Sequence, residues 1–564
     1  MNKSAIYHAA SSNYCFPENL TTVTLRLRVD KSDTFSQIVV VYGWKYDFYV
    51  TQHEQTMTLA YVDNLYAYYE TSINLQKTAF TYVFRLNHNN HNYYYTEDGL
   101  LENYDFKFAF YNCFQLPYIN EIDLPKPVHW WKEAVVYQIF VDRFYRGEKD
   151  KDYINMAWDE IPKNQHQFAG GDLKGIRQKL PYLVKLGINT IYLTPIFSAP
   201  SNHKYDIIDY FNIDQMFGSN KEFKLLIEAA HDQGIKVILD AVFNHVSVEH
   251  PFFKDVIENG DKSKYFEWFI INGSYVNLEE VNYEHFGVAK NMPKLNTSNE
   301  EVIAYLLSVA KHYVEVYKID GYRLDVSDEV SHFFWRKFRE ELKKISNELI
   351  ILGENWHNAY PFLQGDQFDS IMNYSFTKAM LDYLAFNTIN SEEIVYRLNN
   401  LLVRNTNLVN KEMLNLLESH DTHRFFTEVD KNRDKLEQAL AIMFMCLGIP
   451  SLYYGVEIPM NGGYDPDNRR AMEWENIDRE GRYFKNLQQL IRLRKRQSVI
   501  EGTLSLDYDR DIFIITRKFK GETTSLYVNR GKKVTLNAQN VLISNNYQDG
   551  VLHSNGYVIM EENV

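Results

Sequence analysis

Four short acidic segments occupy the middle of the sequence, and each follows a run of apolar residues. The segments are DAVFNH (240–245), GYRLDVSDE (321–329), GENWH (353–357) and ESHDTHR (418–424). The preceding runs, KVILD, YKID, LIILG and EMLNLL, are typical of buried parallel strands. Carboxylates just beyond the carboxyl ends of successive strands are where a (β/α)8 barrel places its chemistry. The spacing therefore predicts one site built from several strand ends.

Two of these carboxylates, Asp325 and Glu354, follow neighbouring predicted strands. Such strands lie about 4.8 Å apart, and cleavage of a glycosidic bond with retention needs a carboxylate nucleophile about 5–5.5 Å from a protonated carboxyl. Arg323 shares a strand face with Asp325, so it should lower the pKa of Asp325 and keep it ionised. Trp356 gives Glu354 an apolar neighbour, which favours the acid form. We predict Asp325 as nucleophile and Glu354 as general acid/base.

The fourth segment adds Asp421 with His420 beside it. Asp421 would stabilise positive charge that develops on the sugar, or bind its hydroxyls. Any one of these acidic residues could instead cap a helix or pair with a cation, and a structural role is the alternative for His420 and Asp421. Four segments that all coincide with strand ends favour the catalytic interpretation.

The composition narrows the class of protein. The chain has 564 residues with 45% apolar and 24% charged residues, so several globular domains are expected. Its net charge of −14 argues against a nucleic-acid partner, and no apolar run is long enough to predict a membrane span or a signal peptide. The three cysteines are widely spaced and lack a CxxC pair, which favours a reduced, cytoplasmic protein. The aromatic fraction of 15% suits stacking on sugar rings, although Tyr-rich strands are the alternative.

The pattern along the chain predicts three domains. Residues 1–124 alternate apolar and polar positions between turn formers, as in an antiparallel β-sandwich. Residues 125–500, which begin with the Pro-containing linker LPKPVHWW, alternate strands and amphipathic helices and predict an α/β (β/α)8 TIM barrel. The extra length between strands three and four predicts a small insertion at about 246–297. Residues 501–564 return to alternation and predict a C-terminal all-β domain, a second β-sandwich.

At these residues the chain resembles the α-amylase family of glycoside hydrolases, from Trp130 to about residue 500. DAVFNH, GYRLDVSDE and SHDTHR are similar to its motifs at strands three, four and seven, and GENWH to its acid/base motif. The string MPKLN (292–296) is similar to the neopullulanase, cyclomaltodextrinase and maltogenic amylase branch. VYGWKYDFY resembles the N-terminal module of that branch, and GGYDPDNRR (462–470) its pattern after strand eight.

The resemblance implies the same roles for Asp325 and Glu354 and makes Asp421 the transition-state stabiliser. It also implies that further residues bind the sugar. The sugar-binding residues at the cleaved linkage and on either side of it are His203, Tyr205, His245, Phe286, Arg323, Trp356, His420, Asp465 and Arg469. Of these, Trp356 and Phe286 would lie on the aglycone side, and Asp465 and Arg469 would bind the next sugar on the non-reducing side.

The implied activity is retaining hydrolysis of α-1,4-glucosidic bonds in cyclodextrins, maltooligosaccharides and pullulan, with some transglycosylation. An enzyme that is mainly an α-glucan transglycosylase, and a non-catalytic glucan-binding protein, are the alternatives. The resemblance also implies a homodimer, in which the N-terminal domain of one subunit covers the active site of its partner.

No cofactor is expected for the chemistry, and the resemblance leaves a structural calcium ion open. Relatives often build a calcium site from an Asn- and Asp-rich loop after strand one together with the GGD segment. In this chain the loop is RGEKDKD (146–152), with Arg146 and Lys151 where neutral ligands would be expected. Asp152 and Asp172 remain, but calcium prefers six to eight oxygen ligands. A lysine ammonium could replace the ion, so the sequence favours its absence.

Overall fold

The computed structural model describes residues 1–124, 126–148 and 151–562. Pro125 of the predicted linker, and residues 149–150 of the loop after strand one, lie outside the described residues. None of the helices in the described part of the chain is both long and apolar enough to cross a membrane.

The chain forms two compact units. The first consists of Met1–Pro127 and Ile389–Asn410, and the second of Val128–Thr388 and Lys411–Val564. The sequence pattern did not predict that a segment near residue 400 would join the first unit. The predicted domain boundaries at residues 124 and 500 stay predictions.

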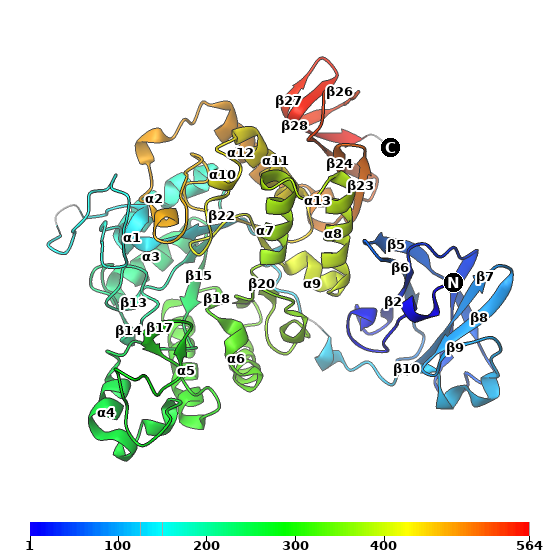
Figure 1. Cartoon of the computed structure of the whole chain (residues 1–564), viewed down its shortest axis with the longest axis horizontal. Coiled ribbons are helices and arrows are strands. Elements are labelled where there is room, and N and C mark those ends of the chain that lie inside the picture. Colours follow the sequence, from blue (N-terminus) through cyan, green and yellow to red (C-terminus); the bar gives the residue numbers. More distant parts are fainter. Residues whose placement is uncertain (125, 149–150, 563–564) are drawn as a thin grey trace. The chain divides into compact units, whose positions relative to one another are not determined.

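Eight short parallel strands form the barrel of the second unit (Figure 1). They are β11 (Val136–Ile139), β12 (Thr190–Leu193), β15 (Lys236–Ala241), β18 (Gly321–Leu324), β19 (Ile350–Gly353), β20 (Ser370–Ile371), β21 (Leu414–Leu416) and β22 (Ile449–Tyr453). Seven neighbouring pairs form a continuous parallel sheet in which β22 pairs with β11. A parallel bridge between Met372 and Leu414 joins β20 to β21. The predicted (β/α)8 fold class is confirmed.

The barrel strands are nearly continuous apolar runs in the sequence, because their side chains are buried on both faces of the sheet. A buried cluster packs against them and includes Val136, Tyr192, Ile238, Ile350, Leu352, Met372, Leu414, Leu416 and Ile449. One predicted strand start was wrong. The fourth strand begins at Gly321 and not at Tyr317, because Tyr313–Tyr317 forms a π-helical turn (η8) and Lys318 is left-handed with φ 63°. A short apolar run does not distinguish the end of a helix from a strand.

Helices connect the barrel strands, and two more follow the last strand. They are α1 (Val141–Phe144), α2 (Leu173–Leu186), α3 (Asn220–Asp232), α5 (Glu300–His312), α6 (His332–Ile345), α7 (Tyr374–Met380), α8 (Ser391–Val403), α9 (Asn407–Glu412), α10 (Phe425–Glu428), α11 (Arg433–Met445), α12 (Arg482–Leu493) and α13 (Gln497–Glu501). Helix α2 shows how the sequence determines where a helix begins and ends. The Asp172 carboxylate caps its start by accepting from Gly175 N–H, and Gly187 ends it with φ 107°.

Two small antiparallel pairs lie in the loops after strands two and three. The first is β13 (Phe197–Ser198) with β14 (Asp209–Ile213). The second is β16 (His285–Phe286) with β17 (Ala289–Pro293), which follows helix α4 (Pro251–Asn259). The chain between β15 and α5 therefore contains more than one connecting helix, where the extra length predicted an insertion.

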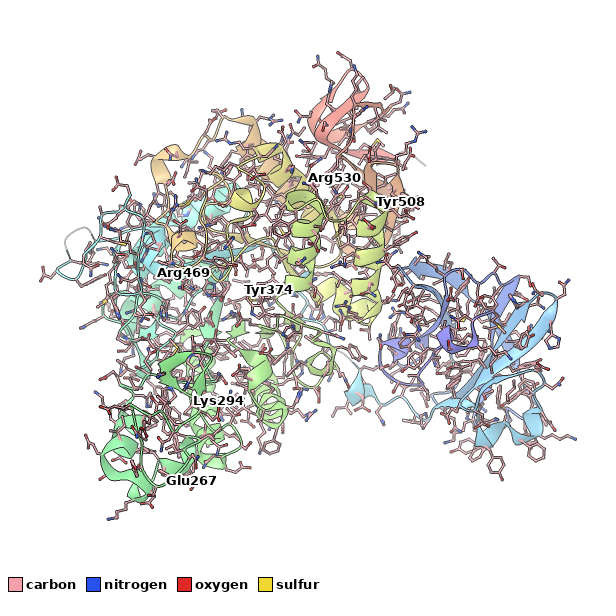
Figure 2. The ribbon with its side chains drawn as sticks, viewed as in Figure 1. Glu267, Lys294, Tyr374, Arg469, Tyr508 and Arg530 are labelled. Atoms are coloured by element: carbon pink, nitrogen blue, oxygen red, sulfur yellow. The ribbon has the colours of Figure 1, made fainter. Side chains whose placement is uncertain are left out.

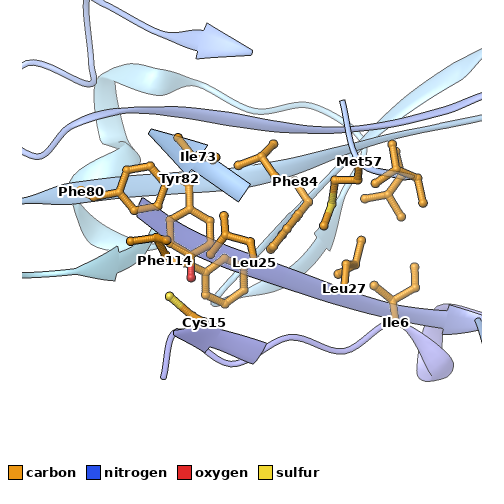
Figure 3. Close-up of a cluster of buried hydrophobic side chains, with 14 of the residues drawn as sticks. Ile6, Cys15, Leu25, Leu27, Met57, Ile73, Phe80, Tyr82, Phe84 and Phe114 are labelled. Carbon is orange, nitrogen blue, oxygen red and sulfur yellow. The ribbon is translucent and has the colours of Figure 1, made fainter. Parts of the chain in front are cut away.

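The N-terminal β domain of the first unit consists of two antiparallel sheets, ordered β1-β2-β6-β5 and β4-β3-β7-β8-β9, with β10 paired to β7. Its strands are β1 (Cys15–Pro17), β2 (Thr22–Asp30), β3 (Gln37–Trp44), β4 (His53–Thr56), β5 (Thr58–Val62), β6 (Tyr66–Asn74), β7 (Phe80–His88), β8 (His91–Thr96), β9 (Gly99–Leu101) and β10 (Phe114–Leu116). Figure 3 shows the buried core between them, where Tyr82 and Phe114 lie beside Leu25 and Cys15.

Helix α8 packs with this β domain through polar contacts. The buried Arg26 side chain donates to the carbonyl oxygens of Val403 at 2.8 Å and Asn405 at 3.2 Å, just past the end of the helix. Asn399 and Asn400 of the helix donate to Val62 O and to the Asp63 carboxylate. A cation at the carboxyl end of a helix satisfies carbonyl groups that have no partner within the helix.

The C-terminal strands form one six-stranded antiparallel sheet, whereas the sequence predicted a β-sandwich. The order is β23-β24-β25-β28-β26, and β27 pairs with β28. The strands are β23 (Thr503–Asp509), β24 (Ile512–Phe519), β25 (Glu522–Asn529), β26 (Val534–Thr535), β27 (Val541–Gln548) and β28 (Val551–Glu562). Alternation in sequence predicts that strands exist, but the partner of each strand depends on long-range pairing. The all-β class of this region is confirmed.

Candidate active site

The carboxyl ends of the barrel strands bring together four carboxylates. Asp240 lies within β15, Asp325 and Glu354 directly follow β18 and β19, and Asp421 lies in the loop after β21. The Asp240, Asp325 and Glu354 side chains are buried, whereas the side chain of Asp421 is 28% exposed. The acidic residues of all four sequence motifs therefore meet at one end of the barrel.

A glycine sets the close approach of the two central strands. A Cβ atom at Gly321 would lie 2.3 Å from the carbonyl oxygen of Ile350, a distance that real side chains do not tolerate. With glycine there, β18 and β19 pair in register along their whole length. Asp325 and Glu354 consequently leave their strands at the same level of the barrel.

The guanidinium group of Arg323 is the centre of the carboxylate cluster. Its Nη1 lies 2.9 Å from Asp325 Oδ1 and 3.0 Å from Asp240 Oδ1, and its Nη2 lies 2.8 Å from Glu354 Oε1 and 3.8 Å from Asp421 Oδ2. Arg323 is fully buried, so these ion pairs are shielded from water. Because Asp325 and Glu354 bind neighbouring nitrogens of one planar group, the structure holds them close together.

One cation does not balance the charge of this cluster. Burial raises the pKa of Glu354 to about 7, with Arg323 acting against it and the Asp421 charge acting with it. Burial likewise raises the pKa of Asp325 well above its usual value, against the pull of Arg323. For Asp421 burial acts upward, but His420, Arg469 and Arg323 together lower its pKa. Asp325 and Glu354 therefore hold protons more tightly than isolated carboxylates would, whereas Asp421 holds its proton less tightly.

Arg323 acts to lower the pKa of Asp325, as predicted, but the net direction of the shift is upward. Burial raises this pKa most, and the charges of Glu354 and Asp240, which bind the same guanidinium, raise it further. Local sequence shows the cation two residues away and does not show the competing carboxylates from other strands.

Trp356 packs against a buried tyrosine. It is 44% exposed, and its ring stacks flat on Tyr374, with centroids 3.6 Å apart and an interplanar angle of 2°. Tyr374 begins helix α7 and is labelled in Figure 2. The raised pKa of Glu354 follows from burial and from neighbouring charges. The Trp356–Tyr374 pair offers an exposed aromatic face near the carboxylates.

Tyr205 and His420 form a second part of the site. Their rings stack with an interplanar angle of 3° and centroids 5.4 Å apart. Tyr205 donates to Asp240 Oδ2 at 2.8 Å and contacts His420 Nε2, while Gln138 binds His420 Nδ1. These partners fit a neutral His420 with its hydrogen on Nε2, and burial lowers its pKa to about 3. His203 lies next to Tyr205, with ring centroids 5.8 Å apart.

His245 and Phe286 form a stacked pair, with centroids 4.9 Å apart and an angle of 14°. Phe286 belongs to the β16–β17 hairpin, and His245 bridges to Lys294 just after it. The buried Nε2 of His245 has no hydrogen-bond partner among the side chains and backbone that the structure describes. Burial lowers the pKa of His245 to about 3, so the ring is neutral and can bind a hydroxyl group.

Arg469 connects the carboxylate cluster to a neighbouring cavity. Its Nη2 lies 3.3 Å from Asp421 Oδ1, its Nη1 lies 2.9 Å from Asp465 Oδ1, and its Nε donates to His420 O at 2.8 Å. Figure 2 labels Arg469. A cavity of about 300 Å³ opens beside it and is lined by Arg143, Asn164, Gln165, His166, Asn202, Asp465, Pro466 and Arg469.

Sequence reasoning missed three residues of this site. Asp240 was quoted in a motif but given no role, although parallel pairing places it directly opposite Arg323. Gln138 is a polar residue in an otherwise apolar buried strand, which is a signal that the sequence contains. Tyr374 lies at a helix start and gives no signal before the fold is known.

The predicted calcium region does not fit a metal ion. The Lys151 ammonium group forms an ion pair with Asp172. Its nitrogen also donates to Gly170 O at 3.3 Å and to Met216 O at 3.4 Å. The positively charged ammonium group already binds the oxygens that a calcium ion would need and would repel the ion, and Asp152 is exposed. Across residues 1–124, 126–148 and 151–562, no three His, Cys, Asp or Glu side chains are grouped so as to hold a metal.

Comparison with known proteins identifies the family. The family model "Alpha amylase, catalytic domain" matches residues 138–520, which is more than half of the chain. The chain belongs to the α-amylase family. A second model, "Alpha amylase, N-terminal ig-like domain", matches residues 1–120.

Individual relatives agree with this assignment. The cyclomaltodextrinase of Thermoanaerobacter pseudethanolicus is 40% identical over 94% of this chain and 93% of its own length. Neopullulanase 2 of Thermoactinomyces vulgaris is 37% identical over 94% and 92%. A solved cyclomaltodextrinase structure superimposes with a TM-score of 0.90 at 34% identity, covering 100% of this chain and 98% of its own. This member of the α-amylase family is therefore a glycoside hydrolase of the cyclomaltodextrinase and neopullulanase type.

Replacing Lys151 tests the role of its ammonium group in place of a metal. The Lys151→Met variant keeps the length of the side chain but leaves the buried Asp172 without its cation. We expect a loss of stability of about 1.5–3 kcal/mol, seen as a lower Tm. EDTA should leave the Tm of the unmodified protein unchanged. The exposed Lys163→Met is the matched control and should melt normally. A Tm that falls on chelation and recovers with calcium would contradict this assignment.

Proposed function

We propose that this enzyme hydrolyses α-1,4-glucosidic bonds in cyclodextrins, maltooligosaccharides and pullulan with retention of configuration, and that it performs some transglycosylation. The family and the relatives support an α-glucan substrate. The observation that carries the mechanism is the Arg323 guanidinium, which binds Asp325 and Glu354 on neighbouring nitrogens. A pair of carboxyl groups held this way can act on the two sides of one linkage.

In the first step, Asp325 attacks the anomeric carbon while Glu354 gives its proton to the leaving oxygen. The glycosidic bond breaks, and a covalent sugar–Asp325 ester forms. With a pKa of about 7, about half of the Glu354 side chains carry a proton in neutral solution. A proton on Glu354 removes its repulsion of a charge on Asp325, and the Arg323 ion pair favours the ionised form of Asp325 against the effect of burial, so the reactive pair is a protonated Glu354 beside an ionised Asp325.

In the second step, Glu354 takes a proton from water as the water oxygen attacks the same carbon and the ester bond breaks. Asp325 leaves as the carboxylate, and two displacements restore the original configuration. A sugar hydroxyl that takes the place of water gives transglycosylation. Asp421 stabilises the positive charge that develops on the sugar in both steps, since its own pKa is lowered and it stays ionised.

The remaining site residues bind the sugar chain. Tyr205 stacks against the ring at the cleaved linkage, and His203, His245, His420 and Arg323 bind its hydroxyl groups. Trp356 and Phe286 provide aromatic faces for the aglycone side. Asp465 and Arg469 bind the next ring on the non-reducing side, where the cavity opens.

Two alternatives differ in what they require. A predominant transglycosylase would make longer or rearranged oligosaccharides from concentrated maltotriose, so product analysis separates it from a hydrolase. A non-catalytic glucan-binding protein would lack one of the catalytic carboxylates, and Asp325, Glu354 and Asp421 are all present.

We also propose a cytoplasmic homodimer. All three cysteines are free and buried, which suits a reducing compartment. The N-terminal β domain exposes an aromatic patch at 59–84% relative exposure, consisting of Tyr46, Tyr49, Phe108, Phe110 and Tyr111. Lys45 lies 5.9 Å from the ring of Tyr46 and 6.0 Å from that of Phe110, so the patch is continuous there. Contiguous exposed apolar surface is typical of protein interfaces.

The nucleophile is tested by the Asp325→Asn variant. The amide has the shape of the carboxylate but is a poor nucleophile, so kcat/KM on γ-cyclodextrin should fall at least about 10³-fold. The Tm should not fall, because one buried negative charge is removed from a crowded cluster. Hydrolysis close to that of the unmodified enzyme would contradict the assignment.

The acid is tested by the pH dependence of kcat/KM. Glu354 donates a proton only below its pKa of about 7, so activity on γ-cyclodextrin should decline roughly tenfold per pH unit above that value. Glu354→Gln should lower activity about 10²–10⁴-fold and remove this alkaline limb. The control, Glu329→Gln, changes a half-exposed carboxyl that pairs with Lys294, and it should keep the limb. A limb that persists in Glu354→Gln would identify another acid.

The dimer is tested by sedimentation over a range of protein concentrations. The double variant Phe108→Ser, Phe110→Ser should weaken self-association at least about tenfold, which equals 1.4 kcal/mol. Leu65→Ser, which alters a residue of the same domain that is 64% exposed, is the matched control. A single subunit at micromolar concentration of the unmodified protein would argue against the dimer.

A further inference from the structure

The cavity beside Arg469 has a second wall to which no role has been given. Asp465, Pro466 and Arg469 form one part of its lining, and the segment Asn164–His166 with Asn202 forms another. Its volume of about 300 Å³ is at the lower end of the range for small-molecule sites, about 300–1,000 Å³. A cavity of this size suits a single sugar ring and not an extended chain.

Two contacts place the cavity next to the catalytic residues. Gln165 Oε1 lies 3.3 Å from His203 Nε2, and His203 lies beside Tyr205. From the other side, Arg469 binds Asp421 directly. The cavity therefore begins one side chain away from the site of bond cleavage.

Hydrogen bonds fix the backbone of the wall, and the side chains of three of its residues are exposed. Asn202 N–H donates to Gln165 O at 2.9 Å, and Asn202 Nδ2 donates to Gln167 O at 2.9 Å. The buried Arg143 donates to Gln167 O at 2.7 Å. The side chains of Asn164, Gln165 and His166 are exposed at the rim. A rigid backbone that presents polar side chains lowers the entropy cost of binding.

We propose that Asn164–His166 and Asn202 form the outer half of the subsite for the second sugar on the non-reducing side, with Gln165 and His166 as specificity-determining residues. The inference rests on the proposed function and deepens it. Amide and imidazole groups both donate and accept hydrogen bonds, as sugar hydroxyls do, so together with Asp465 and Arg469 they complement a glucosyl ring in this cavity. The enzyme consequently prefers substrates with at least two glucosyl units before the cleaved bond.

The test compares p-nitrophenyl α-glucoside with p-nitrophenyl α-maltoside. Nitrophenol release from the first needs only the ring at the cleaved bond, whereas the second also fills the proposed subsite. In the double variant Gln165→Ala, His166→Ala, kcat/KM on the maltoside should fall about tenfold, the effect of one or two hydrogen bonds. The value on the glucoside should fall by much less, because only the Gln165–His203 contact reaches the ring at the cleaved bond. Lys163→Ala, on the same loop but outside the cavity lining, is the control and should alter neither.

The outcomes are distinguishable. A loss that is equal on both substrates, or no loss on either, overturns the subsite while the proposed hydrolase function stands. An unmodified enzyme that cleaves neither glucoside nor γ-cyclodextrin overturns the proposed function itself. Should the double variant fail to fold, Gln165→Asn withdraws the amide by one methylene, and it should give a smaller loss that is again greater on the maltoside than on the glucoside.

Discussion

The ion pairs of the Arg323 guanidinium are the interaction on which the active site depends. Arg323 is fully buried in the fourth strand, yet it reaches carboxylates from the third, fourth and fifth strands and from the loop after the seventh. A buried cation needs such partners, and the crowded carboxylates need the cation. Geometry and protonation are thereby coupled, because moving any one carboxylate changes the charge that the others experience.

The barrel provides this arrangement through strand register. Asp240 pairs directly opposite Arg323, and Gly321 lets the neighbouring strand approach closely enough for Glu354 to reach the same guanidinium. Around this centre, Arg469 and the stacked pair Tyr205–His420 extend the polar network outward. The chemistry thus lies on rigid strand ends, while the loops supply the residues that surround the substrate.

Much of the fold could be predicted from the sequence, because buried parallel strands are nearly continuous apolar runs and polar residues mark their ends. Asp325, Glu354 and Asp421 were found by this signal. The predictions that failed depend on contacts between residues that are far apart in the sequence. The direction of the Asp325 pKa shift, the partner of Trp356 and the role of Asp240 follow from residues on other strands or helices. The start of strand four failed for a local reason, since a short apolar run fits both a helix end and a strand.

The participation of helix α8 in the first unit has a consequence for biosynthesis. Arg26, near the amino terminus, finds its carbonyl partners at Val403 and Asn405, almost four hundred residues later. When only the first domain has emerged from the ribosome, the nascent chain lacks these acceptors. Arg26 then lacks its two hydrogen bonds to Val403 and Asn405. The N-terminal domain is thus completed only after most of the barrel has been translated, which couples the maturation of the two units.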